Sequence, residues 1–393
     1  MYSIILPRFG SVAALTLLLA CGNHNREVRL PSSDTTGLAR SAPGPMGRAS
    51  LRQVATLRIA RAAHTATTLL SGQVLVVGGM VDGGGSVAGV ELFDPTNNTL
   101  QEVGSLADAR VGHTATLLSD GRVVVAGGYN GDYLGSVEVF DPSTQRFRAA
   151  GSLVEPRSGQ TSTLLPDGRV LFVGGIGRGW TFLRSAELYN PQTGRSELVG
   201  SMNVPRESHT ATLLGDGRVL IVGGHSGRRP NVEVYASAEL FDPRTDRFQT
   251  AGALATARHK HDSVRLTDGR VLVIGGADRT DRVHYATTEI YDARTATFAH
   301  GPSMANRRYK IAGTSILLPG GDVLVTSGAP VAELLDIRTW KFRPVPGRLP
   351  AAYRFSAAAA LSEGDVFIAG GYSDRNENTA GVWRFAQSVS ATR

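Results

Sequence analysis

The feature that most constrains the fold of this chain is an internal repeat that runs through nearly all of it. The segment from Arg206 reads R-E-S-H-T-A-T-L-L-G-D-G-R-V-L-I-V-G-G, and a near copy begins at Arg110. Aligned on the V-L-V-x-G-G element, successive copies are 43 to 52 residues apart and end at Gly79, Gly128, Gly175, Gly224, Gly276, Gly328 and Gly371. Because a period of this kind marks an array of identical supersecondary units, we expect seven copies of one unit.

Each copy is expected to contain four short strands. In the second copy they span residues 113–118, 123–126, 137–140 and 147–151, which are rich in β-branched or aromatic residues and bounded by turn residues. Asp-Gly pairs such as Asp120-Gly121 supply the positive φ angles that a two-residue hairpin needs. Asp-Pro pairs such as Asp94-Pro95 fix φ and end a strand. The repeat therefore predicts an all-β chain.

The glycine pairs, the apolar runs before them and their sevenfold repetition resemble the kelch-repeat family, including the propeller domain of galactose-oxidase-like proteins. The resemblance covers residues 51 to 385 and implies a seven-bladed kelch-type β-propeller around a central channel. The seventh copy leaves little chain for a fourth strand, whereas residues 51–57 match the fourth strand at 147–153. We therefore expect the N-terminal segment to close the ring as the outer strand of the last blade.

The first 21 residues predict an export signal. Residues 12–20 are apolar apart from Thr16, and this stretch is too short to span a bilayer. It ends in Leu-Leu-Ala-Cys, which resembles the lipobox of bacterial lipoproteins and makes Cys21, the one cysteine in the sequence, the expected lipidation site. The resemblance and Gly22 favour the outer membrane; a secreted protein is the alternative. Residues 22–48 predict a disordered tether, and 49–393 the propeller.

The chain is basic overall, with a net charge of +7 and a pI near 9.8. This charge identifies no partner by itself. No run of Lys or Arg and no basic-aromatic platform indicates nucleic-acid binding. We expect a monomer that contacts the membrane through its lipid anchor only and binds a protein or glycan ligand, with an acidic ligand as one alternative.

Two polar positions recur in most copies and have two interpretations. An arginine precedes the first strand at Arg61, Arg110, Arg157, Arg206 and Arg258, and blades six and seven are aligned with Lys310 and Tyr353 there. A glutamate recurs in the third strand, at Glu91, Glu138, Glu187, Glu239, Glu289 and Glu333. These residues predict either a basic ring at the channel mouth or a structural Arg–Glu network. We favour the network because buried charges are rarely left unpaired, although the resemblance implies that arginines near this position also hold acidic peptides.

The loops after the glycine pairs differ between copies and are expected to gather on one face with the turns into the first strands. The candidate ligand-binding residues on these loops are Tyr129, Tyr133, Arg178, Trp180, Arg184, His225, Arg228, Arg229, Arg279, Arg282, Tyr285, Tyr372 and Arg375. Aromatic side chains beside arginines suit sugar rings, carboxylates or peptide side chains. The alternative is that these are ordinary solvated loops.

Catalytic signatures are scarce in the sequence, and we single out no catalytic residue, metal ligand or cofactor. Copper chemistry of the galactose oxidase kind needs a tyrosine cross-linked to a cysteine, and no cysteine lies within the repeats. His259 and His261 alternate as metal ligands would, but His261 also belongs to the repeat. The sequence therefore favours a binding module over an enzyme. The alternative is a carbohydrate-active enzyme such as the sialic acid mutarotases found among bacterial periplasmic kelch propellers.

Overall fold

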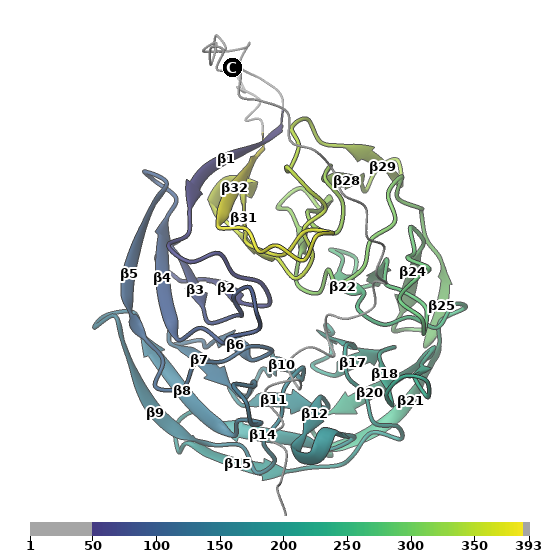
Figure 1. The fold of residues 1–393 in the computed structure, drawn as a ribbon. Helices are drawn as coiled ribbons and strands as arrows, with labels where there is room; N and C mark the ends of the chain where they lie inside the picture. The colour runs from purple at the N-terminus through teal and green to yellow at the C-terminus, as the bar shows by residue number, and fades with distance from the viewer. Residues whose placement is uncertain (1–48, 388–393) are drawn as a thin grey trace, which may run out of the picture.

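The structure, a computed structural model, describes residues 49–387, which form seven four-stranded antiparallel sheets arranged as blades around a centre (Figure 1). The predicted all-β, seven-bladed propeller is thereby confirmed. The predicted signal segment, Cys21 and the predicted tether lie outside the described residues.

Each blade is built from its innermost strand outward, and the innermost strands of neighbouring blades contact one another. Blade one comprises β2 (Thr65–Thr68), β3 (Val74–Val77), β4 (Gly89–Asp94) and β5 (Thr99–Ser105). Blade two comprises β6 (Thr114–Leu117), β7 (Val123–Ala126), β8 (Ser136–Asp141) and β9 (Arg146–Ser152). Blades three and four comprise β10 (Thr161–Leu164), β11 (Val170–Val173), β14 (Ala186–Asn190), β15 (Arg195–Leu198), and β16 (Thr210–Leu213), β17 (Val219–Val222), β20 (Ser237–Asp242), β21 (Arg247–Ala253). Blades five and six comprise β22 (Asp262–Arg265), β23 (Val271–Ile274), β24 (Thr288–Asp292), β25 (Thr297–His300), and β26 (Ser315–Leu317), β27 (Val323–Val325), β28 (Glu333–Asp336), β29 (Lys341–Pro344).

The seventh blade takes its outer strand from the other end of the chain. It comprises β30 (Ala357–Ala360), β31 (Val366–Ala369), β32 (Gly381–Ala386) and, outermost, β1 (Ser50–Thr56). β1 runs antiparallel to β32, with Leu51 opposite Phe385, and Figure 1 shows the purple N-terminal strand beside the yellow C-terminal ones. This confirms the predicted closure, which gives every blade its fourth strand and joins the two ends of the ring.

The hydrophobic core lies between the blades. The second strand of each blade, such as the fully buried β3, is covered on both faces, because each sheet packs against the sheets on either side. At the seam between blades seven and one, the rings of Phe93 and Phe367 lie 4.9 Å apart in one apolar cluster. Strands that are buried on both faces typically carry continuous runs of apolar residues. This explains why the repeat contains the run V-L-V-x and not an alternation of apolar and polar residues.

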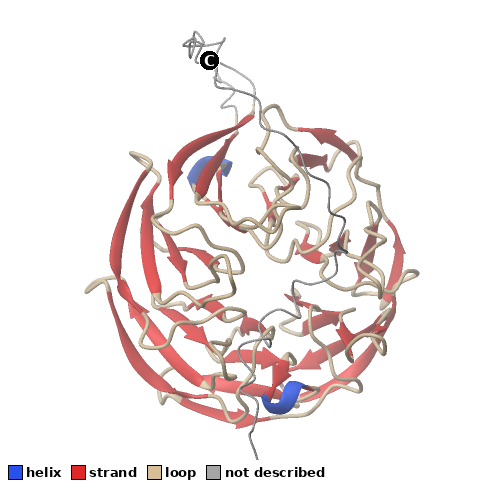
Figure 2. Cartoon of the chain, in the orientation of Figure 1, coloured by secondary structure: helices blue, strands red, loops and turns tan. Residues whose placement is uncertain are grey.

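Strands and loops make up almost all of the described chain (Figure 2). Two short 3-10 turns, η2 (Arg178–Trp180) and η3 (Ser362–Gly364), are its helical segments. Between residues 49 and 387 no helix is long and apolar enough to cross a bilayer.

The recurring arginine and glutamate form a buried ion pair inside a blade. Arg110 Nη2 lies 2.6 Å from Glu138 Oε1, and Arg110 Nη1 donates to the carbonyl of Gly127, the first glycine of the pair. Glu138 also accepts the backbone N–H of Ala107 in the connection from the previous blade. The same ion pair occurs in blades one, three, four and five. The arginine therefore ties together three segments of one blade.

Blade six makes this ion pair with Arg308, whose Nη2 lies 2.7 Å from Glu333 Oε2. The alignment of Lys310 with the repeat arginines is therefore wrong by two residues. Arg308 donates to the carbonyl of Ser327, which replaces the first glycine in this blade. Lys310 instead occupies the second position after the arginine.

The recurring histidine packs against the glycine pair of the preceding blade. His113 Nε2 lies 3.1 Å from Thr65 Oγ1 of blade one. A Cβ atom on Gly78 would lie 2.6 Å from His113 Cε1 and 2.8 Å from the carbonyl oxygen of Arg110. Gly78 also has a φ of +63°, which favours glycine. The glycine pair therefore lets neighbouring blades approach closely.

The second residue after each repeat arginine, or its blade-seven equivalent Tyr353, belongs to a set that we call the inner ring. Its members are Ala63, Gly112, Gly159, Ser208, Lys260, Lys310 and Phe355, and all have left-handed backbones with φ between 50° and 68°. Backbone hydrogen bonds link five of the seven consecutive pairs: for example, Lys260 N–H donates to Ser208, and Lys310 N–H donates to Lys260 over 2.8 Å. The inner ring thus fixes the backbone at the propeller centre whatever side chain a member carries.

Candidate ligand-binding site

One face of the propeller carries a cavity of about 730 Å³ that extends from blade three to blade seven. Its polar and charged lining comes from Glu207, His225, Arg228, Arg229, His259, Lys260, Arg279, Thr280, Asp281, Arg282, His284, Lys310, Arg354, Asp374 and Asn376, and its aromatic lining from Trp180, Phe182, Tyr309 and Tyr372. The volume falls within the range of about 300–1,000 Å³ that is usual for small-ligand pockets. We call this face the loop face.

Two backbone segments of each blade position this lining. In every blade except the sixth, the residue directly after the repeat arginine, or after Tyr353 in blade seven, pairs through a β-bridge with the residue directly after the second glycine. Glu207 pairs in this way with His225, and Arg354 with Tyr372. In blade four the loop continues as a small hairpin, β18 (His225–Ser226) with β19 (Glu233–Val234), which carries Arg228 at its turn. Rigid inner strands therefore present the loops.

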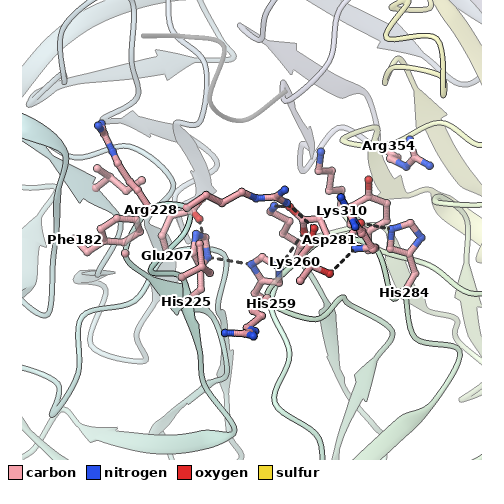
Figure 3. A pocket seen from close by; sticks show the side chains of 18 of the residues that line it. Phe182, Glu207, His225, Arg228, His259, Lys260, Asp281, His284, Lys310 and Arg354 are labelled. Atoms are coloured by element: carbon pink, nitrogen blue, oxygen red, sulfur yellow. Dashed lines mark hydrogen bonds and ion pairs between the residues drawn. The ribbon is translucent and has the colours of Figure 1, made fainter. Parts of the chain in front are cut away.

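Four titratable side chains form a continuous row across the cavity. Glu207 Oε2 lies 3.3 Å from His225 Nδ1, and His225 Nδ1 lies 3.1 Å from His259 Nδ1. His259 Nε2 lies 3.0 Å from Asp281 Oδ1. One proton arrangement fits these distances: His259 donates from Nε2 to the carbonyl of Asp278, beside the Asp281 carboxylate, and accepts at Nδ1 from the N–H of His225. Figure 3 shows this row running from Glu207 to Asp281.

Burial sets the protonation of this row. It raises the pKa of Glu207 and lowers the pKa values of His225 and His259, because each charged form loses solvation. Burial alone would also raise the pKa of Asp281, but the hydrogen bond from His259 and the charge of Lys260 outweigh it and hold that pKa far below its usual value. The row therefore contains neutral imidazoles next to a firmly ionised aspartate.

The opposite side of the cavity is cationic. Lys310 Nζ donates to the Tyr372 hydroxyl, and the Arg354 guanidinium pairs with Asp374. Arg354 also lies over the Tyr309 ring, 4.9 Å from its centroid, and the His284 ring stacks on the same tyrosine at 3.7 Å. Figure 3 places Lys310, His284 and Arg354 together, across the cavity from Glu207 and His225.

An aromatic cluster forms the blade-three wall. The hairpin β12 (Ile176–Gly177) with β13 (Thr181–Phe182) encloses η2 and presents Trp180 and Phe182. The Arg228 guanidinium lies 3.8 Å from the centroid of the Trp180 ring, and Phe182 meets His225 edge-on at 5.5 Å. This wall joins an apolar surface of blade three to a cation of blade four, Arg228, whereas the arginines of blade three, Arg178 and Arg184, lie outside the lining.

The structure places seven of the predicted ligand-binding residues on the cavity: Trp180, His225, Arg228, Arg229, Arg279, Arg282 and Tyr372. The other six lie outside its lining, namely Tyr129, Tyr133, Arg178, Arg184, Tyr285 and Arg375. Tyr133 is buried and packs against Trp180, and Tyr285 lies beside the structural Arg258. The Arg178 side chain is 70% exposed.

Several lining residues were not among the sequence candidates, above all Glu207, Lys260, Tyr309, Lys310 and Arg354. All five occupy the two positions after the repeat arginine or its equivalent. In the first three blades these positions hold small or apolar residues, Ala62-Ala63, Val111-Gly112 and Ser158-Gly159. The change to charged and aromatic residues in blades four to seven is the signal that would have located the cavity.

The lining does not suit the copper site of galactose-oxidase-like enzymes. The described residues contain no cysteine to cross-link with a tyrosine. Among residues 49–387 no group of three or more His, Cys, Asp or Glu side chains is arranged to hold a metal ion. The side chains of His225 and His259 are hydrogen-bonded to each other. We therefore assign no step to copper.

Comparisons with known proteins agree with this architecture. The Kelch motif matches residues 110–153, which span blade two from its repeat arginine to its outer strand. Among solved structures, a fungal alcohol oxidase of the AA5 family, in complex with copper, superposes with a TM-score of 0.67 at 16% identity, covering 87% of this chain and 77% of that chain. No curated protein matches the sequence. The described residues therefore form a seven-bladed β-propeller whose second blade matches the Kelch motif.

Proposed function

We propose that the protein is an extracytoplasmic, membrane-tethered binding module that recognises a protein or glycan ligand through the loop face of its propeller. The observation that carries this proposal is the concentration of chemically distinctive residues on one cavity. Positions that hold small residues in blades one to three hold Glu207, His259, Lys260, Lys310 and Arg354 in later blades. Variation confined to loops on a rigid repeat scaffold is the usual way in which such scaffolds carry binding sites.

The cavity favours a glycan within this proposal. It is enclosed on several sides and is of small-ligand size. Its walls combine the rings of Trp180 and Tyr309, which pack against Arg228 and His284, with hydrogen-bonding groups such as His225. Sugars present apolar ring faces and hydroxyl edges, so they match a pocket of this composition better than a flat protein surface does.

The experiment is a binding screen of the chain from residue 49 onward against a glycan panel and against proteins of a cell-envelope extract. We expect saturable binding to one ligand class, and Arg228→Ala is expected to weaken it. Arg195→Ala is the matched control, because Arg195 is an exposed arginine on the outer strand β15. Absence of saturable binding to both ligand sets would refute the proposal.

A second candidate function is supported by the row from Glu207 to Asp281. Linked acid and base groups in a partly buried cavity are suited to moving protons, as in a carbohydrate-active enzyme such as a sialic-acid-mutarotase-like epimerase. The test is to follow anomer exchange of acidic and neutral sugars by NMR. Exchange above the background rate that is lost in Glu207→Gln would replace the binding-only function with this one.

A further inference from the structure

The cavity of the loop face has two chemically different ends. One end holds Glu207, whose burial raises its pKa, next to the neutral His225. The other end holds Lys310 and Arg354, with the paired His284 and Tyr309 rings beside them. Figure 3 shows Glu207 and His225 on one side of the cavity and Lys310, Arg354 and His284 on the other. A ligand bound across the cavity would therefore meet different charges at its two ends.

Cations outnumber anions in the lining. The cavity is lined by seven Lys or Arg side chains and by three Asp or Glu side chains. Asp281 is shared, because Lys260 lies 2.7 Å away, His259 3.0 Å and Arg229 3.4 Å. The partner of Arg354 is Asp374, whose side chain is 68% exposed, and water screens such a pair strongly. The lining therefore retains positive charge after its own ion pairs are counted.

Lys310 is the most deeply placed cation at this end. The residue is 7% exposed, and its Nζ lies 5.2 Å from the Tyr309 and Tyr372 ring centroids and 5.4 Å from that of Phe355. Burial, reinforced by the nearby charge of Lys260, lowers the pKa of Lys310 to about 7. Near neutral pH this amine is thus poised between its charged and neutral forms.

We propose that the cavity binds the anionic group of a glycan at Lys310 and Arg354, and that Lys310 takes up a proton as the anion binds. This inference rests on the proposed binding function and names the chemical class of its ligand. The anion is a carboxylate or a sulfate ester, since either oxyanion accepts hydrogen bonds from an ammonium and a guanidinium. The sugar ring then lies toward Tyr309 and His284, with its hydroxyl groups toward Glu207 and His225.

Proton uptake follows from linkage. A bound anion next to Lys310 favours the ammonium, so the pKa of Lys310 is higher in the complex than in the free protein. Above pH 7 the neutral amine of Lys310 must be protonated before it can bind the anion. Because the pKa of Lys310 is about 7 in the ligand-free protein, the affinity for the anion is expected to fall about tenfold between pH 6 and pH 8. The charged or titratable groups around Lys310 are Glu207, Lys260, Asp281, His284, Tyr309, Arg354 and Tyr372.

The test uses the full chain purified in detergent and three matched disaccharides. One carries a uronate carboxylate, one a sulfate ester at the same position, and one a neutral primary alcohol there. Titration calorimetry at pH 8 in two buffers of different ionisation enthalpy measures the protons taken up. We expect at least one anionic disaccharide to bind with an uptake of about 0.9 proton at pH 8 and about 0.1 at pH 6.

Three variants separate the roles of individual residues. Lys310→Met keeps the length of the side chain and is expected to weaken anionic binding by about tenfold to a hundredfold and to abolish proton uptake. Arg354→Gln should weaken binding and retain part of the proton uptake, because loss of the Arg354 charge raises the pKa of Lys310 in the ligand-free protein. Arg195→Gln removes an exposed arginine of the outer strand β15 that does not line the cavity, so it should change neither quantity.

The outcomes distinguish this inference from the broader proposal. Equal affinity for neutral and anionic disaccharides, or anionic binding without proton uptake by the unaltered protein, overturns the inference and leaves glycan binding intact. Loss of proton uptake in Glu207→Gln would mean that Glu207, and not Lys310, takes up the proton, and this result would also overturn the inference. Binding of inorganic sulfate or acetate as tight as that of the disaccharides would show that the site selects the anion and not the sugar. Absence of binding to every sugar and protein would remove the proposed function as well.

Discussion

Arg308 Nη2 lies 2.7 Å from Glu333 Oε2, and both side chains are almost completely buried. This contact reproduces in blade six the Arg–Glu ion pair of blades one to five, although the Gly-Gly pair beside it has become Ser327-Gly328. The ion pair is therefore preserved independently of the glycine that accompanies it elsewhere.

Removal of one partner of this pair should strongly destabilise the propeller. Arg308→Met leaves the Glu333 carboxylate buried without its cation, and we expect the free energy of unfolding to fall by about 3–5 kcal/mol. The measurement is urea unfolding followed by tryptophan fluorescence. Arg338→Met is the control in the same blade: its side chain is 87% exposed and 3.6 Å from Asp336, so its effect should stay within about 0.5 kcal/mol. Equal effects of the two variants would contradict the structural role.

Ring closure predicts that the N-terminal strand stabilises the whole domain. A chain that begins at Arg58 lacks β1 and exposes the backbone groups of β32 that β1 pairs with. We expect a cooperative loss of stability compared with a chain that begins at Ala49, visible as a lower melting temperature of the entire far-ultraviolet transition. Identical melting curves would mean that β1 is dispensable for closure.

The first glycine of a pair should not tolerate a side chain. In Gly174→Ala the new Cβ would lie 2.5 Å from the Arg206 carbonyl oxygen and 2.9 Å from His209 Cε1, at a φ of +64°. Backbone strain of about 1–2 kcal/mol and overpacking of about 1–3 kcal/mol should add. Gly320→Ala is the control, since nothing lies within 4 Å of its Cβ position and its φ angle lies outside the left-handed region. We expect a normal melting temperature for the control alone.

Trp180 is expected to act in binding more than in folding. Its ring is covered mainly by Arg228 and Tyr133. Trp180→Ala should weaken binding of the glycan found in the screen by about 2 kcal/mol or more while changing the unfolding midpoint little. Trp180→Gly makes a useful comparison, because Trp180 has a φ of +63° that glycine adopts without strain. Loss of stability in both variants with unchanged binding would make Trp180 a structural lid.

Lipid anchoring predicts that one residue determines membrane association. Cys21→Ala should move the protein from the membrane pellet into the soluble fraction, because lipid chains contribute about 0.8 kcal/mol per buried CH₂ and the variant would carry none. Fractionation after a high-salt wash removes purely electrostatic binding. Retention of the variant in the washed pellet would contradict the proposed anchor.

Much of the fold could be predicted from the sequence because a comparison of the seven copies shows which residues all blades share. Closure by β1 was predictable for the same reason, since residues 51–57 match the outer strands of other blades. The alignment of blade six was wrong at Lys310 because the repeat histidine is replaced there by Ile311, which packs against Gly275 in its place. Without the histidine or a glycine pair, the sequence does not show whether Arg308 or Lys310 corresponds to the repeat arginine.

The candidate site was only partly predictable, and the reason is geometric. The loops after the glycine pairs were recognised as variable, which located Arg228 and Tyr372. The two positions after the repeat arginine lie between the arginine and the histidine of the structural motif, so the sequence does not single out Glu207 and aligns Lys310 with the arginines. The three-dimensional arrangement shows that these positions face the centre, while the arginine and the histidine beside them are buried within and between the blades.

The inner ring has a consequence for how such proteins diversify. Its backbone hydrogen bonds run from main chain to main chain, and its left-handed conformation is held by Ala63, Ser208, Lys310 and Phe355 alike. Mutation at one member can therefore change the chemistry of the propeller axis while the hydrogen bonds between members remain. Duplication of a blade therefore supplies a structural unit together with one more side-chain position at the propeller axis.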